Sequence, residues 1–393
     1  MRLQRWGIYW VTLLAIVGSL LTGCSLPQVS AEQRTFLQVS LEFLDEAIIP
    51  KTSFAGTPVG GLSGITYDRQ RDRFYVVSDD RSELAPARFY TLKVQLDPTL
   101  GVGDAIASVD LEGVTFLQTE EGNPYPRGTI DAEGIALSPQ STVFISSEGN
   151  INLDIPPGLK EFELNSGQFV QRFPIPQHDL SLTEEGQPIQ GIQNNFGFEA
   201  LATNPIGTIP AAGEPLRLFT VTEAALVQDL TNPEDPDFAT RTRWLHYYLS
   251  EGPPLILSEH LYLLESPPPG AVLHGIPEIV ALDGGGHFLS LERSFGLKGF
   301  TIRLFQLFTG DATDISGISS LQGSLMGLQP IRKQLVLDLQ DLDITLDNLE
   351  GMTLGPRLPD GSQSLWLISD DNFRDDQKTQ LLLFRLRRES TQS

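Results

Sequence analysis

The chain has 393 residues with 50 acidic and 27 basic side chains, and its formal net charge at pH 7 is −23. This excess of negative charge repels nucleic acid and anionic lipid headgroups, and no basic cluster offsets it, so the composition excludes nucleic acid as a partner. The 36 glycines and 27 prolines are scattered along the chain, which favours many turns and few long helices.

The first element in chain order is a secretory signal at residues 1–23. Two arginines precede an apolar run at residues 8–21, which is shorter than the about 20 residues of a typical transmembrane helix. The four residues LTGC end this segment at Cys24 and resemble the lipobox of bacterial lipoproteins. Cys24 is the only cysteine in the chain, so a disulfide within the chain is impossible.

Cleavage before Cys24 would leave a cysteine that carries lipid, palmitate included, as a membrane anchor. We therefore expect residues 24–35 to be a lipidated tether. The protein is then exported and faces the periplasm or the exterior, on the bacterial cell membrane or the outer membrane. An ordinary cleaved signal followed by a stray cysteine is the alternative.

A repeated pattern begins at residue 62 and recurs in five segments, at intervals of roughly 70 residues. One polar position is shared by the five segments. It holds Ser63, Glu133, Glu199, Glu278 and Glu350. A second apolar run that ends near an acid follows each segment, as in FYVVSDD at 74–80 and LWLISDD at 365–371. Further runs rich in β-branched and aromatic residues follow in most units, which indicates strands.

Units of four strands repeated around an axis predict an all-β fold, a β-propeller. We count five blades, and six remain possible if residues 94–130 or 300–340 contain an irregular blade. Two stacked β-sandwiches are the alternative, but they do not explain acids at matched positions.

The fifth unit lacks its fourth strand. The N-terminal run at residues 36–47 can supply this strand by pairing with residues 379–387, and the pairing closes the ring. The predicted propeller domain spans residues 36–388, and residues 389–393 form a short tail.

In each predicted blade, the acid of the first strand and the acid of the second strand fall at the same end, because the two strands are antiparallel. We therefore predict an acidic mouth at one end of the channel. Its candidate metal ligands are Glu133, Glu148, Glu199, Glu223, Glu278, Glu292, Glu350 and Asp370. Carboxylates gathered in this way must be protonated, pair with arginine or bind a cation.

Oxygen ligands in an exported protein favour Ca²⁺ or Mg²⁺ over softer metals, and Ca²⁺ is the cofactor that we expect. The alternative is that the acids only accept hydrogen bonds from backbone amides of the neighbouring blade. The five histidines of the chain show no close metal-binding spacing, so we expect them to be surface or packing residues.

Eight motifs, taken together and in order, resemble the phytase-like family described as having esterase-like activity. They are GGLSGITYD, FYVVSDDR, DAEGIAL, ISSEGN, NNFGFEAL, SLERSF, DNLEGMTLGP and LISDDNF. The resemblance runs from about residue 36 to 388, and Ser63 looks normal for the first unit of the family. It implies an exported propeller that hydrolyses phosphate esters or other esters. Metal-dependent phytases of the propeller type hold Ca²⁺ at an acidic mouth, which is a parallel of architecture.

We therefore expect a membrane-anchored, cation-dependent hydrolase that acts on a small-molecule ester or phosphoester at the acidic mouth. The candidate catalytic residues are Glu199, Glu350, Asp370, Arg81 and Arg293. The two arginines could bind phosphate oxygens. The competing hypothesis is a non-catalytic module that binds a ligand or acts as a scaffold on the cell envelope. Aromatic residues near the motifs favour it, namely Phe196, Phe198, Phe295 and Phe373.

Overall fold

The computed structural model describes a large part of the chain, namely residues 35–99, 104–184, 187–203, 216–231 and 239–388. The predicted signal, Cys24 and the tail at 389–393 lie outside these described residues. The chain divides into two units, Met1–Leu37 and Gln38–Ser393, and the fold below is that of the second unit. Among the described residues, the longest helical elements are short turns, and none has the length and apolar character to cross a membrane.

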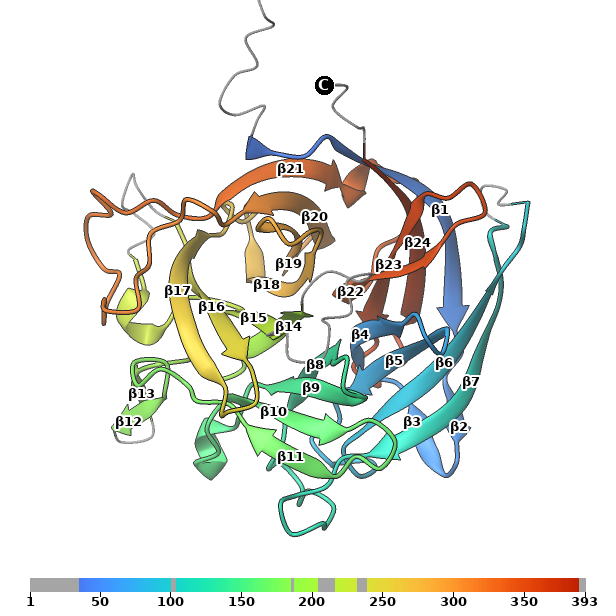
Figure 1. Cartoon of the computed structure of the whole chain (residues 1–393), viewed down its shortest axis with the longest axis horizontal. Helices are drawn as coiled ribbons and strands as arrows, with labels where there is room; N and C mark the ends of the chain where they lie inside the picture. Colours follow the sequence, from blue (N-terminus) through green and yellow to red (C-terminus); the bar gives the residue numbers. More distant parts are fainter. Residues whose placement is uncertain (1–34, 100–103, 185–186, 204–215, 232–238, 389–393) are drawn as a thin grey trace, which may run out of the picture. The chain divides into compact units, whose positions relative to one another are not determined.

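Five antiparallel sheets of four strands each stand around a central axis (Figure 1). From the axis outward, blade 1 contains β4 (Leu62–Asp68), β5 (Arg73–Ser78), β6 (Arg88–Leu96) and β7 (Ile106–Phe116). Blade 2 contains β8 (Ala132–Leu137), β9 (Thr142–Ser147), β10 (Gly158–Glu163) and β11 (Phe169–Arg172). Blade 3 contains β14 (Phe198–Thr203), β15 (Leu216–Thr222), β16 (Arg241–Leu249) and β17 (Leu255–Leu263). Blade 4 contains β18 (Ala271–Ala281), β19 (His287–Gly296), β20 (Gly299–Phe308) and β21 (Arg332–Asp338).

Blade 5 takes strands from both ends of the chain. It contains β22 (Asn348–Arg357), β23 (Gln363–Asp370), β24 (Thr379–Arg388) and β1 (Val39–Ile49). β1 pairs antiparallel with β24, with Val39 opposite Arg388 and Ile49 opposite Thr379. Asp45 of β1 also accepts a hydrogen bond from the backbone N of Ile106 in β7 (2.7 Å). The predicted closure of the ring by the N-terminal strand is confirmed, and the closing strand also contacts blade 1.

The predicted all-β propeller of five blades is confirmed, and the described residues contain no sixth blade. The two stretches that left room for one hold the outer strand of blade 1 and the outer strands of blade 4. The remaining elements are small. They are the hairpins β2 (Thr52–Phe54) with β3 (Thr57–Val59) and β12 (Leu182–Glu184) with β13 (Gln187–Gln190), and the 3₁₀ turns η1 (Ile151–Leu153), η2 (Val227–Asp229) and η3 (Leu339–Asp341).

The apolar core lies between neighbouring blades. Trp366 of β23 contacts Phe74 of β5, with ring centroids 5.3 Å apart, and both belong to one buried cluster between blades 5 and 1. Similar clusters join blades 1 and 2, blades 2 and 3, and blades 3 and 4. Burial of each large apolar side chain contributes about 1.5–3 kcal/mol, so this packing fixes the inner strands around the channel.

The loop between β20 and β21, residues 309–331, leaves blade 4 and covers the outer strand of blade 3. Its backbone donates from Ile315 to the carbonyl of Glu259 (2.8 Å) and from Ile331 to the carbonyl of Leu261 (2.8 Å) in β17. Ile315 and Leu261 also share a small buried apolar cluster. This segment, which we call the 309–331 loop, is therefore packed against blade 3.

Candidate functional site

The acids at the starts of inner strands and at the ends of second strands gather on a cavity of about 440 Å³. We call this cavity the acidic mouth. Six of the eight predicted metal ligands line it, namely Glu133, Glu148, Glu199, Glu223, Glu350 and Asp370. The candidate catalytic residues line it as well, since Arg81 and Arg293 join Glu199, Glu350 and Asp370 there.

Glu278 does not belong to the acidic mouth. The pairing registers place it at the position that Gly351 holds in β22, so Pro277 stands at the acidic position of blade 4. The Glu278 carboxylate is buried and accepts hydrogen bonds from the backbone N of Leu201 (3.0 Å) and of Ile279 (2.9 Å). Leu201 lies in the inner strand of blade 3, so Glu278 links two blades. The structure therefore places Glu278 between two blades, away from the mouth where the sequence predicted it.

Glu292 lies between blades 3 and 4 and does not line the mouth. Its carboxylate accepts hydrogen bonds from the hydroxyl of Tyr262 (2.6 Å), from Nζ of Lys333 (2.6 Å) and from the backbone N of Glu265 (3.0 Å). Because side chains alternate along a strand, the next residue, Arg293, faces the channel instead. The end of the second strand in blade 4 therefore presents a cation to the ring of acids.

Arg293 ties the acids of two other blades together. Its guanidinium donates to Glu223 (2.8 Å), to the side chain of Asn348 (2.9 Å) and to Glu350. Burial acts against the charge of Arg293, but the carboxylates of Glu350 and Glu223 outweigh burial and raise its pKa. Arg293 therefore remains protonated and compensates two buried carboxylates.

Arg81 serves a second group of acids, on the side of blades 1 and 2. Its Nε donates to Asp131 and lies 3.9 Å from Asp79, and its Nη2 donates to Asn195. Asp131 was not among the predicted ligands. Asp131 precedes β8 by one residue in the DAEGIAL motif. Its position two residues before the repeated acid Glu133 could have identified it as a further ligand.

Two groups of three carboxylates have the spacing of a cation site. Asp79, Asp131 and Glu133 form one group, and each contributes an oxygen within 4.8 Å of the others. The same holds for a second group. It contains Glu148, Glu199 and Glu223. Within the described residues, Oδ1 of Asp79 and Oε2 of Glu199 are buried without a hydrogen-bond partner. Unpaired buried carboxylate oxygens are costly, and a bound cation would compensate them.

The electrostatics of these groups agree with their geometry. Burial raises the pKa of Glu133, Glu148 and Glu199 well above the usual range of a glutamate, and the charges of neighbouring carboxylates raise it further. The raised pKa values favour the protonated form of these acids when no cation is bound. A cation that displaces the protons would leave them ionised.

Aromatic side chains line one side of the mouth. Phe196, Phe295 and Phe300 contribute to the cavity, and the rings of Phe295 and Phe300 lie 4.7 Å apart. The other two predicted phenylalanines lie elsewhere, because Phe198 is fully buried in the core between blades 2 and 3 and Phe373 packs over the backbone of Gly61. The mouth therefore combines charged and aromatic side chains.

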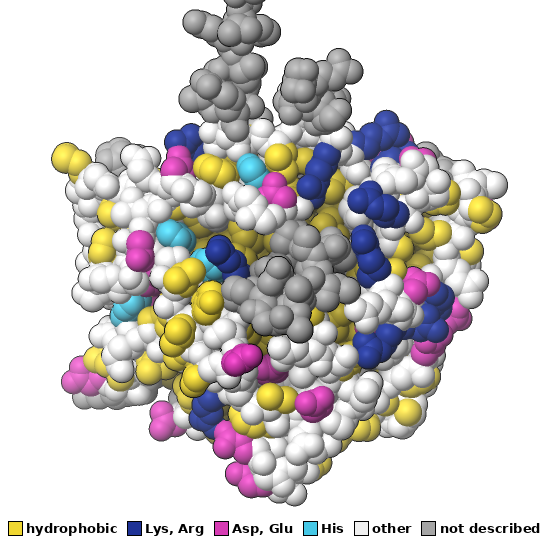
Figure 2. Space-filling model, viewed as in Figure 1, with side chains coloured by type: hydrophobic (Ala, Val, Ile, Leu, Met, Phe, Trp, Pro, Cys, Tyr) yellow, Lys and Arg dark blue, Asp and Glu magenta, His cyan; other side chains and the backbone are white. Residues whose placement is uncertain are grey.

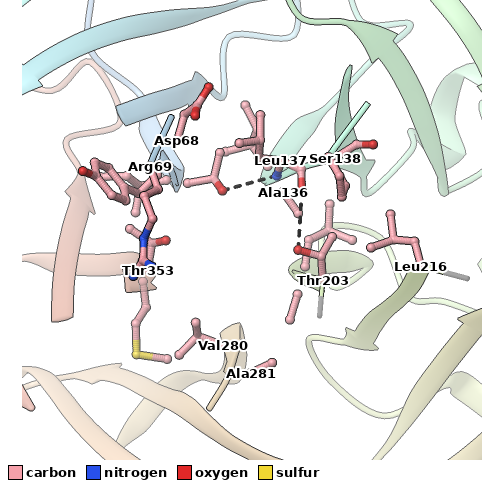
Figure 3. Close-up of a pocket in the computed structure, with 18 of the residues that line it drawn as sticks. Asp68, Arg69, Ala136, Leu137, Ser138, Thr203, Leu216, Val280, Ala281 and Thr353 are labelled. Atoms are coloured by element: carbon pink, nitrogen blue, oxygen red, sulfur yellow. Dashed lines mark hydrogen bonds between the residues drawn. The ribbon is translucent and has the colours of Figure 1, made fainter. Parts of the chain in front are cut away.

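The opposite end of the same inner strands forms a smaller pocket of about 190 Å³ (Figure 3). Ala136, Val280 and Thr353 are among its lining residues. Leu137 connects neighbouring strands there, because its N donates to the Thr66 hydroxyl (3.3 Å) and its carbonyl accepts from Thr203 (3.5 Å).

Charge is unevenly distributed on the surface of the molecule. On the face drawn in Figure 2, Lys and Arg side chains gather to the right of the centre, and acidic side chains are scattered.

The family model described as "Phytase-like: Esterase-like activity of phytase" matches residues 57–373 of the chain. No curated protein matches. Solved structures match this chain at low identity and low TM-score. They include the catalytic domain of the Coprinopsis cinerea GH62 α-L-arabinofuranosidase, which is 12% identical over 89% of this chain and 98% of that one, with a TM-score of 0.37. They also include the calcium-binding protein regucalcin from Agrobacterium tumefaciens, which is 11% identical over 85% of this chain and 93% of that one, with a TM-score of 0.36.

Proposed function

We propose, because this chain belongs to the phytase-like family, that it is an exported hydrolase which cleaves phosphate esters or other esters at the acidic mouth in a Ca²⁺-dependent reaction. The observation that carries the proposal is the pair of carboxylate groups at one cavity, each with a buried oxygen that lacks a hydrogen-bond partner among the described residues. Their all-oxygen donor sets fit a hard cation.

The charge of the mouth supports a cation as part of the site. The cavity is lined by nine carboxylates and three arginines, so an anionic ester would be repelled by the empty mouth. Asp79, Asp131 and Glu133 would hold one ion, and Glu148, Glu199 and Glu223 would hold another. Bound Ca²⁺ would screen the negative charge of a phosphate and polarise the ester.

The arginines differ in what they can offer a substrate. Arg293 is buried and fully engaged by Glu223 and Glu350, so its role is to hold these acids in place. The side chain of Arg81 is 34% exposed and that of Arg374 is 64% exposed, and both line the mouth. These two are the groups that would bind the oxygens of a phosphate.

The test is a phosphatase and esterase screen of the purified chain, with Ca²⁺ and with a calcium chelator. We expect hydrolysis of a phosphate or carboxylic ester that requires Ca²⁺ and disappears in the Glu199→Gln variant. A chain that binds Ca²⁺ but turns over no ester contradicts the proposal. It would favour the second candidate, a binding module on the cell envelope, which the wall of Phe196, Phe295 and Phe300 supports.

We also propose that lipid on Cys24 anchors the protein to a membrane outside the cytoplasm. The apolar run before LTGC and the single cysteine support this. Cys24→Ser should abolish acylation and leave the precursor uncleaved by the lipoprotein peptidase, which metabolic labelling with palmitate and a gel shift would detect. Normal processing and retained membrane anchoring of the variant would contradict the lipid anchor.

A further inference from the structure

A second cluster of ionisable groups lies in blade 3, outside the acidic mouth. His178 and Asp179 come from the segment before β12, and Glu259 comes from β17. One ligand atom from each of the three lies within 4.8 Å of the others. Nε2 of His178 is 3.0 Å from Oε2 of Glu259 and 3.6 Å from Oδ1 of Asp179.

Asp179 is the observation that points to a ligand. Its side chain is 0% exposed, and neither of its carboxylate oxygens has a hydrogen-bond partner within the described residues. One of the two oxygens faces Nε2 of His178 at a distance longer than a hydrogen bond. A buried carboxylate without any hydrogen-bond partner is rare, and here it lies beside two side chains of types that bind metals.

Carboxylates outnumber the guanidinium groups around Asp179. Arg243 is fully buried, binds both oxygens of Asp229 (2.6 and 3.1 Å) and donates to Glu259 (3.1 Å). Asp179, Asp229 and Glu259 are therefore three carboxylates around the single guanidinium of Arg243, which contacts only the last two. A divalent cation would bring this buried cluster to neutrality.

Nε2 of His178 lies close to both a hydrogen-bond donor and a hydrogen-bond acceptor. Its Nε2 lies 3.2 Å from Nη1 of Arg243, which can only donate, and 3.0 Å from the carboxylate of Glu259, which can only accept. A proton on Nε2 satisfies Glu259 and opposes Arg243, and the unprotonated atom does the reverse. A cation bound to Nε2 and shared with Glu259 removes the conflict, because Arg243 keeps Asp229 and the carbonyl of Ile318 (3.0 Å).

We propose that His178, Asp179 and Glu259 bind one divalent transition-metal ion of the Zn²⁺ type, as a structural site separate from the acidic mouth. One nitrogen and two oxygen donors suit Zn²⁺ and disfavour Ca²⁺, which prefers oxygen. Donor atoms of a tetrahedral zinc site with these bond lengths lie about 3.4 Å apart, close to the separations in the cluster. The side chain of His178 is 16% exposed, so a water molecule can reach a fourth position.

The position of the cluster explains what a bound ion would do. Glu259 also accepts a backbone hydrogen bond from Ile315 (2.8 Å), and Arg243 donates to Ile318, both in the 309–331 loop. The ion would therefore join the segment before β12 to the outer strand of blade 3, directly under this loop. We expect it to stabilise the 309–331 loop against local opening.

The experiment uses the full chain, freed of metal with a chelator and then held in excess Ca²⁺ so that the acidic mouth is saturated. Zn²⁺ is added, and bound zinc is counted by elemental analysis after desalting. We expect one Zn²⁺ per chain, a higher melting temperature and slower proteolysis within the 309–331 loop. With Co²⁺ as a substitute, we expect visible absorption bands typical of a nitrogen and oxygen ligand set.

Two ligand variants and one control make the result specific. His178→Gln and Asp179→Asn should each lose the bound Zn²⁺ and the Co²⁺ bands, with circular dichroism confirming that they fold. His260→Gln changes the adjacent histidine in β17, which binds Ser258 and the carbonyl of Thr313 instead, and it should keep the zinc. No zinc in the wild type, or equal zinc in the ligand variants, would overturn the proposal. So would an Asp179→Asn variant that gains metal-free stability and still binds Zn²⁺.

Discussion

At one end of the central channel, carboxylates from several blades surround a cavity of about 440 Å³, and at the other end mostly uncharged side chains surround a cavity of about 190 Å³. The far end has one acid in its lining, Asp68, and it is paired with Arg71 (2.7 Å). Its polar groups mainly connect neighbouring strands through the Thr66 and Thr203 contacts to Leu137.

This difference distinguishes the contacts that hold the blades together from the acids that packing does not require. The far end holds the blades together with apolar contacts and satisfied hydrogen bonds, which is sufficient for packing. The mouth retains buried carboxylate oxygens without partners, at Asp79 and Glu199, although each costs folding free energy. Perturbed acids gathered in a cleft are typical of functional sites, so the mouth is the end where ligands are expected.

The largest expected effect comes from the cation that holds the mouth together. Arg293→Met leaves Glu223 and Glu350 buried without their charge partner, which should destabilise the chain by about 3–5 kcal/mol in metal-free buffer. Saturating Ca²⁺ should restore part of this loss. Urea unfolding with and without Ca²⁺ measures both. Arg374→Met, at an exposed arginine of the same cavity, should show no comparable loss; equal losses in the two variants would mean that Arg293 does not hold the acids.

The second effect concerns the carboxylates themselves. Glu199→Gln combined with Glu350→Gln removes two charges while nearly keeping size, and should weaken Ca²⁺ binding at least tenfold, or about 1.4 kcal/mol. Calorimetric Ca²⁺ titration and the Ca²⁺-induced rise in melting temperature report it. If the acids only brace the blades, the double variant loses stability equally with and without Ca²⁺, and the wild type shows no binding heat.

A smaller effect is expected from pH. Because the pKa values of Glu133, Glu148 and Glu199 are raised in the folded state, the metal-free protein binds more protons than the unfolded chain above the ordinary glutamate range. Stability contributed by these groups is therefore present at low pH and lost as pH rises above about 4.3 toward the folded values. Acidification from pH 7.5 to pH 5 should therefore raise the metal-free melting temperature, because the free energy of unfolding increases by at most about 1.4 kcal/mol per pH unit for each proton.

Calcium should change the sign of this dependence. Acids that coordinate an ion are ionised, so acidification protonates them, releases the bound Ca²⁺ and lowers the melting temperature. Parallel thermal scans in Ca²⁺ and in chelator across the same pH range make the comparison. Identical pH profiles in the two buffers would show that the raised pKa values and the cation do not involve the same carboxylates.

The smallest effect belongs to the far end of the channel. Met352→Leu conserves volume at the pocket of Figure 3, and should cost less than about 1.5 kcal/mol with no change in Ca²⁺ binding or hydrolysis. Thermal unfolding and the same calcium titration check it. A loss of Ca²⁺ binding in this variant would mean that the two ends of the channel are coupled.

The repeat in the sequence was sufficient to predict the blades, the closure by the N-terminal strand and the common end of most acids. The prediction failed in blade 4, where the repeat aligned Glu278 with the acids of the other blades. The strand register shows that Pro277 stands at that position and that Glu278 is shifted by one residue. The same one-residue ambiguity applies to Glu292 and Arg293, since neighbouring residues of a strand face opposite sides. In each case the pattern of apolar residues does not decide which of the two neighbouring residues faces the channel.

Clusters made from separate segments were out of reach of the sequence. His178 and Glu259 are 81 residues apart and meet only because the outer strand of blade 3 packs beside the segment before β12. Spacing rules detect metal ligands that share one helix or turn, so the histidines carried no signal. Asp131 was missed for a simpler reason, because it lies just before the strand that carries the repeated acid.

The closing strand has a mechanical consequence if Cys24 is held in a lipid bilayer. Any pull on the protein then reaches the propeller through Val39, the first residue of β1, which pairs with Arg388 at the end of β24. Force would load this antiparallel ladder from its outer end, and the ring would open by peeling before any inner strand moved. The strand that completes the fold is also the point where a tethered molecule under tension would yield first.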